Sequence, residues 1–450
     1  MIFRQVSTCL YKKMKPKTKK ILIISYYWPP AGGPGVQRWL KFVKYLPDFG
    51  WEPTVFIPEN PSYPIVDETL QKDVPKNLKM IKTKIWEPYQ LAEKFGKDNK
   101  KFRAGQFDVG ENQSWKAKLS IFVRGNFFIP DARVFWVKPS VEFLEKYLKV
   151  NHYDVLVTTG PPHSLHLIGL NLKKKLPDLK WIADFRDPWT EISYYKHLKL
   201  TKIADKKHRK LESEVFKNAD VTLATSYTDA ENFRKKGANA FCITNGFDSE
   251  VESQKSEVGS KNSTNKFTLS YVGVLEQLRD PGNLWWTLYE IMCENEEFSN
   301  DFELKFVGKV DNKIQQSLFH IGIDQNIKYL GYLPHEQALQ EMQDSTVLLM
   351  TNFPQESSKG IIPGKIFEYL ATGKTILSFG PKDADVEKIL NETKAGKHFG
   401  YDEKENLKKF ILESYENWKL GTLNQNAENI EQFSRKNLTQ KLVDLMNKWF

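Results

Sequence analysis

The stretch ILIISYYWPPAGGPGVQRWLKF, residues 21–42, decides how the chain is interpreted. A short apolar run breaks at Pro29 and Pro30, three glycines follow, and a helical pattern then begins. In parallel α/β sheets, this order of strand, glycine-rich loop and helix leaves backbone N–H groups free at the helix start, where they attract anions. We therefore predict an α/β fold in which Gly33 and Gly35 bring the backbone close to a ligand.

This loop does not match the two best-known phosphate-binding motifs. A dinucleotide fingerprint reads G-x-G-x-x-G, and Arg38 stands where its third glycine would be. The G-K-[ST] ending of a Walker loop is absent. What remains is a glycine-rich turn at a helix start. Arg38, one turn later, is a candidate for a bidentate contact with a phosphate or an acceptor group.

The same alternation of apolar runs and helical patterns continues along the chain. Near-continuous apolar runs are typical of parallel strands that are covered on both faces. A first series of strands is expected at 21–25, 53–58, 154–159, 181–185, 220–225 and 240–244, and a second at 267–273, 303–308, 326–331, 346–351 and 375–380. Two such series predict two doubly wound, Rossmann-like α/β domains.

Composition sets the expected boundaries. Residues 248–266 are polar and Ser-rich without apolar periodicity, as linkers are. The expected order is a basic leader at 1–18, a first domain at 19–247 with an insertion at about 84–140, the linker at 248–266, a second domain at 267–425 and a C-terminal helix at 426–450.

Part of the insertion, residues 114–136, mixes cations with Trp, Phe and Ile. Two interpretations stay open for it. It is either an amphipathic lid that lies on a membrane or grips a lipid-linked acceptor, or a core-packed segment whose cations extend to solvent.

The net charge of +10 is uneven, because residues 1–20 contain seven Lys or Arg and no acid, which leaves +3 for the rest. We expect a solvated, disordered leader, with contact to anionic lipid as the alternative and Met14 as an alternative start. Charge concentrated in a tail argues against nucleic-acid binding. Three widely spaced cysteines and no apolar run of roughly 18 residues predict a cytoplasmic protein, with peripheral contact to the inner membrane face as a further option.

Glycines close four strands of the second series, at Gly273, Gly308, Gly331 and Gly380. Glycine at the carboxyl end of a parallel strand lets a ligand approach the backbone. One such glycine is ordinary turn chemistry, whereas four in one domain predict a shared ligand-binding edge.

Two cations stand near this edge. Arg279 lies in the loop after the strand at 267–273 and can neutralise an anionic leaving group. Gly364 opens a helix that carries Lys365 and Glu368 on one face, where a phosphate would meet Lys365 and the helix start, and a ribose diol would meet Glu368. An exposed ion pair between these two side chains is the alternative.

Two motifs look superficially like metal sites. His163 and His166 are three residues apart, but a zinc site needs further ligands and none completes it. Asp-x-Asp at 383–385 stands directly before a helix, where acids act as caps. We therefore expect helix capping in both places and no metal.

The segment DFRDPW, 184–189, follows a strand and should reach the same sheet edge as His163. Arg186 is flanked by Asp184 and Asp187, which is consistent with a structural ion pair or with contacts to an acceptor and a phosphate. We favour the second interpretation.

These motifs, taken in order, resemble those of glycosyltransferase family 4. The segments are the opening strand and glycine loop, DFRDPW, NADVTLATS (218–226) with ITNGFD (243–248), YVGVLEQLRDP (271–281) and PGKIFEYLATGKTIL (363–377). The resemblance covers most of residues 19–450 and is nearest to bacterial members that build cell-surface polysaccharides. It implies a GT-B fold, with two Rossmann-like domains facing across a cleft, the acceptor on the first, the nucleotide-sugar on the second, and the last helix crossing back to the first. It also implies retention of anomeric configuration without an obligatory metal.

By motif, Arg279 resembles the family's diphosphate-binding cation, and Glu368 the second Glu of its Glu–seven residues–Glu motif, which binds ribose. The first Glu of that motif falls at Gly360, a basic residue that often follows the first strand glycine is Val274, and a common histidine aligns with Arg186. These departures concern the sugar and the stabilising groups rather than the fold.

The resemblance implies transfer of a sugar from a nucleotide-sugar to a glycan or lipid-linked acceptor, with a nucleotide-sugar epimerase or a non-catalytic sugar-nucleotide-binding subunit as alternatives. No cofactor is expected. The candidate site comprises catalytic Arg279, Lys365 and Arg186, donor-binding Gly33, Gly35, Gly273, Gly308, Gly364 and Glu368, and acceptor-side Arg38, His163, Asp184 and Asp187.

Overall fold

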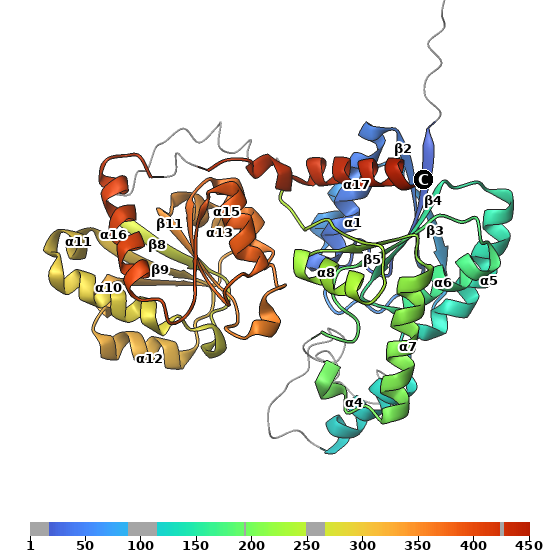
Figure 1. Ribbon diagram of the computed structural model, residues 1–450, viewed down its shortest axis with the longest axis horizontal. Coiled ribbons are helices and arrows are strands. Elements are labelled where there is room, and N and C mark those ends of the chain that lie inside the picture. The colour runs from blue at the N-terminus through green and yellow to red at the C-terminus, as the bar shows by residue number, and fades with distance from the viewer. Residues whose placement is uncertain (1–17, 89–114, 193–194, 249–265, 424–426) are drawn as a thin grey trace, which may run out of the picture.

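Figure 1 shows the computed structural model of the chain, which describes residues 18–88, 115–192, 195–248, 266–423 and 427–450. Two separate parallel sheets each carry helices, and the chain passes from the first to the second and back. We call these two α/β units the first and second domains. The predicted leader, most of the predicted linker and part of the predicted insertion lie outside the described residues.

The first domain contains a seven-stranded parallel sheet in the order β3-β2-β1-β4-β5-β6-β7. The strand order reverses between β1 and β4, and ligands of open α/β sheets bind outside the carboxyl ends of the strands at such a reversal. The strands are β1 Lys19–Ile24, β2 Trp51–Pro58, β3 Lys79–Thr83, β4 Val155–Gly160, β5 Trp181–Phe185, β6 Val221–Ala224 and β7 Ala240–Cys242.

Helices cover both faces of this sheet, which explains why its strands are apolar on both sides. Ile21 and Ile23 pack in the layer that contains α1, whereas Leu22 and Ile24 pack in the layer that contains α5 and α6. The helices are α1 Pro34–Tyr45, α4 Trp115–Phe127, α5 Val134–Val150, α6 Ser164–Lys175, α7 Lys202–Asn218 and α8 Tyr227–Lys235.

The second domain contains a six-stranded parallel sheet in the order β10-β9-β8-β11-β12-β13, which reverses between β8 and β11. The strands are β8 Phe267–Val272, β9 Phe302–Val307, β10 Ile327–Gly331, β11 Val347–Thr351, β12 Thr375–Phe379 and β13 Gly396–Phe399. The helices are α10 Gly282–Glu294, α11 Glu296–Asp301, α12 Asn312–Ile321, α13 His335–Asp344, α14 Lys365–Thr372, α15 Asp385–Thr393 and α16 Glu405–Lys419. Short 3-10 helices in the two domains lie at Leu46–Phe49, Glu68–Asp73, Tyr195–Leu198, Gln277–Arg279, Asp324–Asn326, Glu356–Ser358 and Ile430–Phe433.

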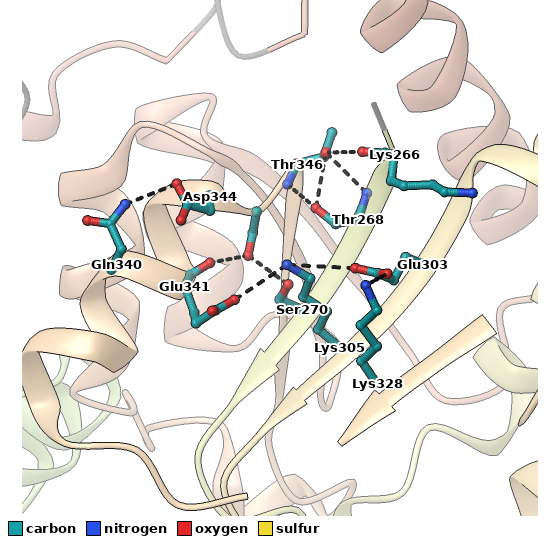
Figure 2. Close-up of polar contacts among 11 residues, drawn as sticks. Lys266, Thr268, Ser270, Glu303, Lys305, Lys328, Gln340, Glu341, Asp344 and Thr346 are labelled. Atoms are coloured by element: carbon teal, nitrogen blue, oxygen red, sulfur yellow. Dashed lines mark hydrogen bonds and ion pairs between the residues drawn. The ribbon is translucent and has the colours of Figure 1, made fainter. Parts of the chain in front are cut away.

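One face of the second sheet carries a network of polar side chains beside α13 (Figure 2). The Nζ atom of Lys305 in β9 lies 3.4 Å from a carboxylate oxygen of Glu341 in α13 and 3.7 Å from one of Glu303. The Thr346 N–H donates to the Thr268 hydroxyl at 2.8 Å. Thr268, Glu303 and Lys305 belong to the amino-terminal and middle parts of β8 and β9, and Thr346 directly precedes β11. The network therefore satisfies buried polar groups away from the carboxyl edge, where ligand binding is expected.

The last helix, α17 (Arg435–Trp449), lies against the first domain (Figure 1). Leu442 and Met446 are buried in the same core layer as α1. Just before α17, the Phe247 N–H donates to the Phe433 carbonyl at 3.2 Å and the Arg435 N–H donates to the Phe247 carbonyl at 2.8 Å. The end of the first domain at Phe247 thus runs beside the segment Phe433–Arg435.

Two strands were not among those expected from the sequence. β3 is an edge strand whose residues are half-buried or exposed, and β13 is a four-residue edge strand that begins at Gly396. An apolar run is the signal of a strand covered on both faces, so short edge strands with polar residues escape it.

Candidate functional site

Bare backbone lies at the carboxyl end of β8. Gly273 and Gly308 have φ of 126° and 115°, a region that L side chains rarely adopt. A Cβ on Gly308 would overlap the Gly273 carbonyl, so only glycine lets these two strand ends pack together. A Cβ on Gly273 would lie 3.6 Å from the Lys365 ammonium, and none of the neighbouring atoms comes within 4 Å of where a Cβ on Gly364 would be.

Lys365 begins α14 and reaches back over this backbone. Its ammonium donates to the Val272 carbonyl at 3.2 Å and lies 3.9 Å from the centre of the Tyr271 ring. Burial lowers the pKa of Lys365 to about 7, with a further contribution from Arg279 that Glu368 opposes. An anion at this position would offset both causes.

Arg279 stands at the end of the 3-10 helix η4 (Gln277–Arg279), directly after β8. Its guanidinium donates to the Val274 carbonyl at 2.9 Å, contacts Glu276 at 3.3 Å and lies over the Phe353 ring. The Nε atom is buried and finds no acceptor among the described residues. Arg279 and Lys365 therefore place two cations beside glycine backbone that no side chain covers, an arrangement suited to a diphosphate.

Glu368 lies one turn into α14, with its carboxylate close to charged groups of other elements. Burial raises the pKa of Glu368, while His335, Arg435 and Lys365 oppose the rise. A buried carboxylate of this kind gains from hydroxyl donors such as a ribose diol.

Tyr332 was not singled out from the sequence. It follows Gly331 at the end of β10 and is 90% exposed. His335, whose charge acts on Glu368, begins α13 three residues later. An exposed aromatic residue directly after a strand-closing glycine is the signal that would have found it, and its ring suits stacking on a nucleobase.

On the first domain, Arg186 holds the glycine-rich loop before α1 by hydrogen bonds. Its guanidinium donates to the carbonyls of Gly35, Gly160 and Pro161. A Cβ on Gly35 would overlap this guanidinium, which explains the glycine. Burial lowers the pKa of Arg186, while Asp187 and Asp184 oppose the fall. Arg186 thus joins the ends of β4 and β5 to the start of α1.

Arg38 and Asp184 do not lie at the surface, contrary to the acceptor-side prediction. Their side chains are 2% and 0% exposed and form an ion pair of 2.9 Å. Arg38 also donates to the Thr244 carbonyl at 3.0 Å, and Asp184 accepts from Trp39 at 2.7 Å and Thr159 at 3.0 Å. The reason is that Asp184 lies within β5 rather than after it, so its side chain points into the domain.

His163 is also buried, which differs from its predicted acceptor-side place. Its ring stacks on Trp189 with a centroid distance of 5.2 Å, and neither ring nitrogen has a partner among the described residues. Burial lowers the pKa of His163 to about 3, so the ring is neutral at physiological pH. Among the residues that the structure describes, no three His, Cys, Asp or Glu side chains gather as a metal site would require.

Asp187 and Gly33 do stand at the accessible edge. The Asp187 side chain reaches solvent, yet nearby protein removes enough water to raise the pKa of its carboxyl, an effect that Arg186 opposes. Gly33 is the N-cap of α1 with φ of 97°, and the structure leaves open space around its Cα.

The two domains touch where α8 meets α15. The Thr228 N–H and hydroxyl both donate to the fully buried Asp385 carboxylate, each at 2.8 Å. The expectation that the Asp-x-Asp segment caps its helix is therefore wrong. Ala384 is the N-cap of α15 without a side-chain bond, and Asp385 instead binds the opposite domain.

Comparisons with known proteins agree with this architecture. No protein-family profile and no curated protein sequence matches the chain. Among solved structures, HepE from Anabaena in complex with UDP-glucose superimposes with a TM-score of 0.55 at 13% identity, covering 95% of this chain and 99% of that one. TarM from S. aureus, with UDP bound, gives 0.55 at 11% identity, covering 95% and 100%. A protein from Listeria monocytogenes assigned as a UDP-N-acetylglucosamine 2-epimerase gives 0.51 at 13% identity, covering 95% and 96%.

At these identities the likeness concerns the fold alone. The chain has a GT-B-like fold, and the predicted class of two Rossmann-like domains is confirmed. Membership of glycosyltransferase family 4 stays a prediction. Of these three structures, one contains UDP-glucose, one contains UDP, and one is assigned as a UDP-N-acetylglucosamine 2-epimerase.

Proposed function

We propose that the protein is a glycosyltransferase that moves a sugar from a nucleotide-sugar donor to a glycan or lipid-linked acceptor, with retention and without an obligatory metal, in cell-surface polysaccharide synthesis. The observation that carries the proposal is the meeting of Lys365, Arg279 and the start of α14 over the backbone of Gly273. A poorly solvated lysine and an arginine whose buried Nε has no acceptor among the described residues, both beside glycine backbone, are matched to a diphosphate better than to a neutral ligand.

The donor would extend along the carboxyl edge of the second sheet. Its diphosphate would lie between Arg279 and Lys365, its ribose diol would donate to Glu368, and its base would stack on Tyr332. The sugar would then face the first domain, where the Gly33 loop has open space around its backbone.

The chemical contribution of this arrangement is electrostatic. Breaking the bond from the sugar C1 to the diphosphate leaves negative charge on the departing oxygen, and fixed cations in a poorly solvated site stabilise it. Lys365, Arg279 and the N–H groups at the start of α14 stand where this charge would develop. They act without having to reorganise during the reaction.

The proposed acceptor is bound to, or made at, a membrane surface. In α4, Trp115 and Phe127 are 68% and 71% exposed, and the adjacent start of α7 exposes Ile203. Lys118 and Lys202 are exposed beside them. Aromatic residues with flanking cations suit the interface of an anionic bilayer. Within the described part of the chain, no helix has the length and apolar character needed to cross a membrane.

Binding and transfer assays test this proposal. UDP-, GDP- and ADP-sugars are screened by thermal shift, since a bound donor raises the unfolding midpoint by mass action. Arg279→Ala and Glu368→Ala should abolish the shift and the transfer, whereas Gly33→Val should impair transfer more than binding. A protein that binds no nucleoside diphosphate, or that transfers sugar equally well with both alanine variants, would refute the assignment.

A nucleotide-sugar epimerase on the same fold is the second candidate. It needs two acid–base groups near the sugar, and two carboxyls at the carboxyl edge of the first sheet, Asp187 and Asp229, have a raised pKa. Formation of a new nucleotide-sugar when donor is incubated without any acceptor would favour it. Binding without turnover over a broad acceptor panel would instead indicate a non-catalytic subunit.

A further inference from the structure

The start of α8 belongs to the first domain but lies against the second. Thr228 is held by Asp385 at 2.8 Å through two hydrogen bonds, and the Asp385 N–H donates to the Lys359 carbonyl at 2.9 Å. These contacts bring residues 226–229 onto the loop that precedes α14. We call this contact region the seam.

Gly360 is the point of closest approach on the seam. A Cβ there would lie 3.2 Å from the Ser226 hydroxyl and from the Thr228 Cβ, and 3.4 Å from Oδ1 of Asp229. These distances leave little room for a side chain. Glycine at this position lets the Asp229 carboxylate approach the backbone of the opposite domain directly.

The loop that meets Asp229 also carries part of the proposed donor site. Asn352 donates to the Ile361 carbonyl at 2.9 Å and so fixes the loop on the end of β11. The Tyr401 hydroxyl bonds the Asn352 carbonyl, and the Arg279 guanidinium covers Phe353, the next residue. A short series of contacts therefore connects Arg279 to the seam.

Asp229 is poorly solvated for a carboxylate. Burial raises the pKa of Asp229 to about 6, and nearby acids add to the rise while the Ser226 hydroxyl opposes it. Asp229 lies in the first turn of α8, where acids are common, and its backbone N–H donates to the Ser226 hydroxyl at 3.1 Å. The charged groups that act on it or flank it are Asp187, Glu191 with Lys236, and Asp385 with Lys388.

Resting on the proposed function, we infer that Asp229 is a substrate-contacting carboxylate, supplied by the first domain, that accepts hydrogen bonds from hydroxyl groups of the transferred sugar. The geometry points to this role because the seam sets Asp229 against the loop of the donor site from the opposite side. A carboxylate short of water gains hydrogen bonds when sugar hydroxyls reach it. A site built around such an acceptor also discriminates strongly against sugars that lack the hydroxyl.

The first test compares two ligands on one protein. The nucleotide-sugar of the UDP-, GDP- and ADP-glucose panel that gives the largest thermal shift is titrated by calorimetry alongside its nucleoside diphosphate. Asp229→Asn should weaken binding of the nucleotide-sugar about 10- to 100-fold and change binding of the diphosphate less than about threefold, because only the sugar meets position 229. Glu231→Gln, on the exposed side of the same helix, should change neither.

The second test is the pH profile of kcat/KM for the same donor. The wild-type rate should fall below pH about 6 as Asp229 becomes protonated and loses its acceptor capacity. Asp229→Asn should lack this limb and Asp229→Glu should restore it, which a merely structural role would not produce. Unchanged unfolding midpoints would show that the variants remain folded.

The outcomes separate the role of Asp229 from the proposed function. Equal losses of sugar-nucleotide and diphosphate binding, or none in either, would overturn the role of Asp229 while leaving the proposed function intact. If the wild-type protein binds no member of the panel, the proposed function fails and the inference fails with it.

Discussion

Protonation of Lys365 should control donor binding. The ammonium is held over the Tyr271 ring at 3.9 Å from the ring centre, and its pKa is lowered to about 7. A diphosphate needs the charged form, so the free protein must take up a proton whenever it binds donor above that pH. Affinity should therefore fall as the pH rises, whereas a site of ordinary lysines, which stay charged from about pH 7 to pH 9, would show no such dependence.

The size of the effect follows from the pKa. With a pKa of about 7, roughly half of the free protein carries the proton at pH 7 and roughly one hundredth at pH 9. If the bound form stays protonated, affinity falls about 50-fold over this range, or ~2.3 kcal/mol. At pH 8, binding should take up about 0.9 proton.

Calorimetry in buffers of different ionisation enthalpy measures both quantities. A nucleotide-sugar is the better ligand, because the terminal phosphate of a free nucleoside diphosphate titrates near pH 6 and would add its own slope. Lys365→Arg is the matched control, since a guanidinium stays charged throughout and should remove the dependence on pH. Equal affinities at pH 7 and pH 9 with no proton uptake in the wild-type protein would refute the reasoning.

Three further changes test other parts of the structure. Gly35→Ala places a Cβ where the Arg186 guanidinium lies, so urea unfolding should show a loss of about 1–3 kcal/mol, and no loss would mean that the loop adapts. Thr228→Val removes one of two hydrogen bonds to the fully buried Asp385 carboxylate across the seam. The free energy of unfolding should fall by about 1–3 kcal/mol, and X-ray scattering should show a more open molecule. An unchanged scattering profile would contradict a role of this bond in holding the two domains together. Phe127→Glu should weaken flotation with vesicles that contain anionic lipid. Val150→Glu, at another exposed apolar position at the end of α5, should not weaken it. Equal effects of the two changes would exclude a specific contact of α4 with the membrane.

Local sequence was sufficient to predict where the candidate residues of the second domain lie in the fold. Gly273, Arg279, Lys365 and Glu368 sit in short motifs whose spacing alone places them at a strand end or on one helix face. The same holds for both α/β series, because strands covered on two faces must be apolar. Tyr332 was missed although it directly follows Gly331, because the sequence alone does not show that its ring is exposed.

The first-domain residues could not be placed in this way. The Arg38–Asp184 pair joins residues 146 positions apart. The strand at 181–185 was predicted with its observed ends, but these ends do not tell whether the Asp184 side chain points inward or outward. The bond from Thr228 to Asp385 depends on how two domains meet, and no local pattern contains that information. Sequence therefore identified candidate residues, but it could not distinguish a buried ion pair from an exposed one.

The cations of the two domains are paired to different extents. On the first domain, Arg38 is paired with Asp184 and Arg186 is bound to three carbonyls, so these cations hold the loops in place and have little charge left to attract a ligand. On the second domain, burial lowers the pKa of Lys365, whose ammonium bonds a carbonyl and lies over an aromatic ring. Arg279 contacts Glu276, but its buried Nε has no acceptor among the described residues. An anion would thus gain most on the second domain, where it relieves desolvated cations. Under the proposed function, the opening loop with its three glycines would form the side of the donor site on the first domain. Its backbone can lie close to the diphosphate, and the two bound cations of this domain do not compete with Lys365 and Arg279 for it.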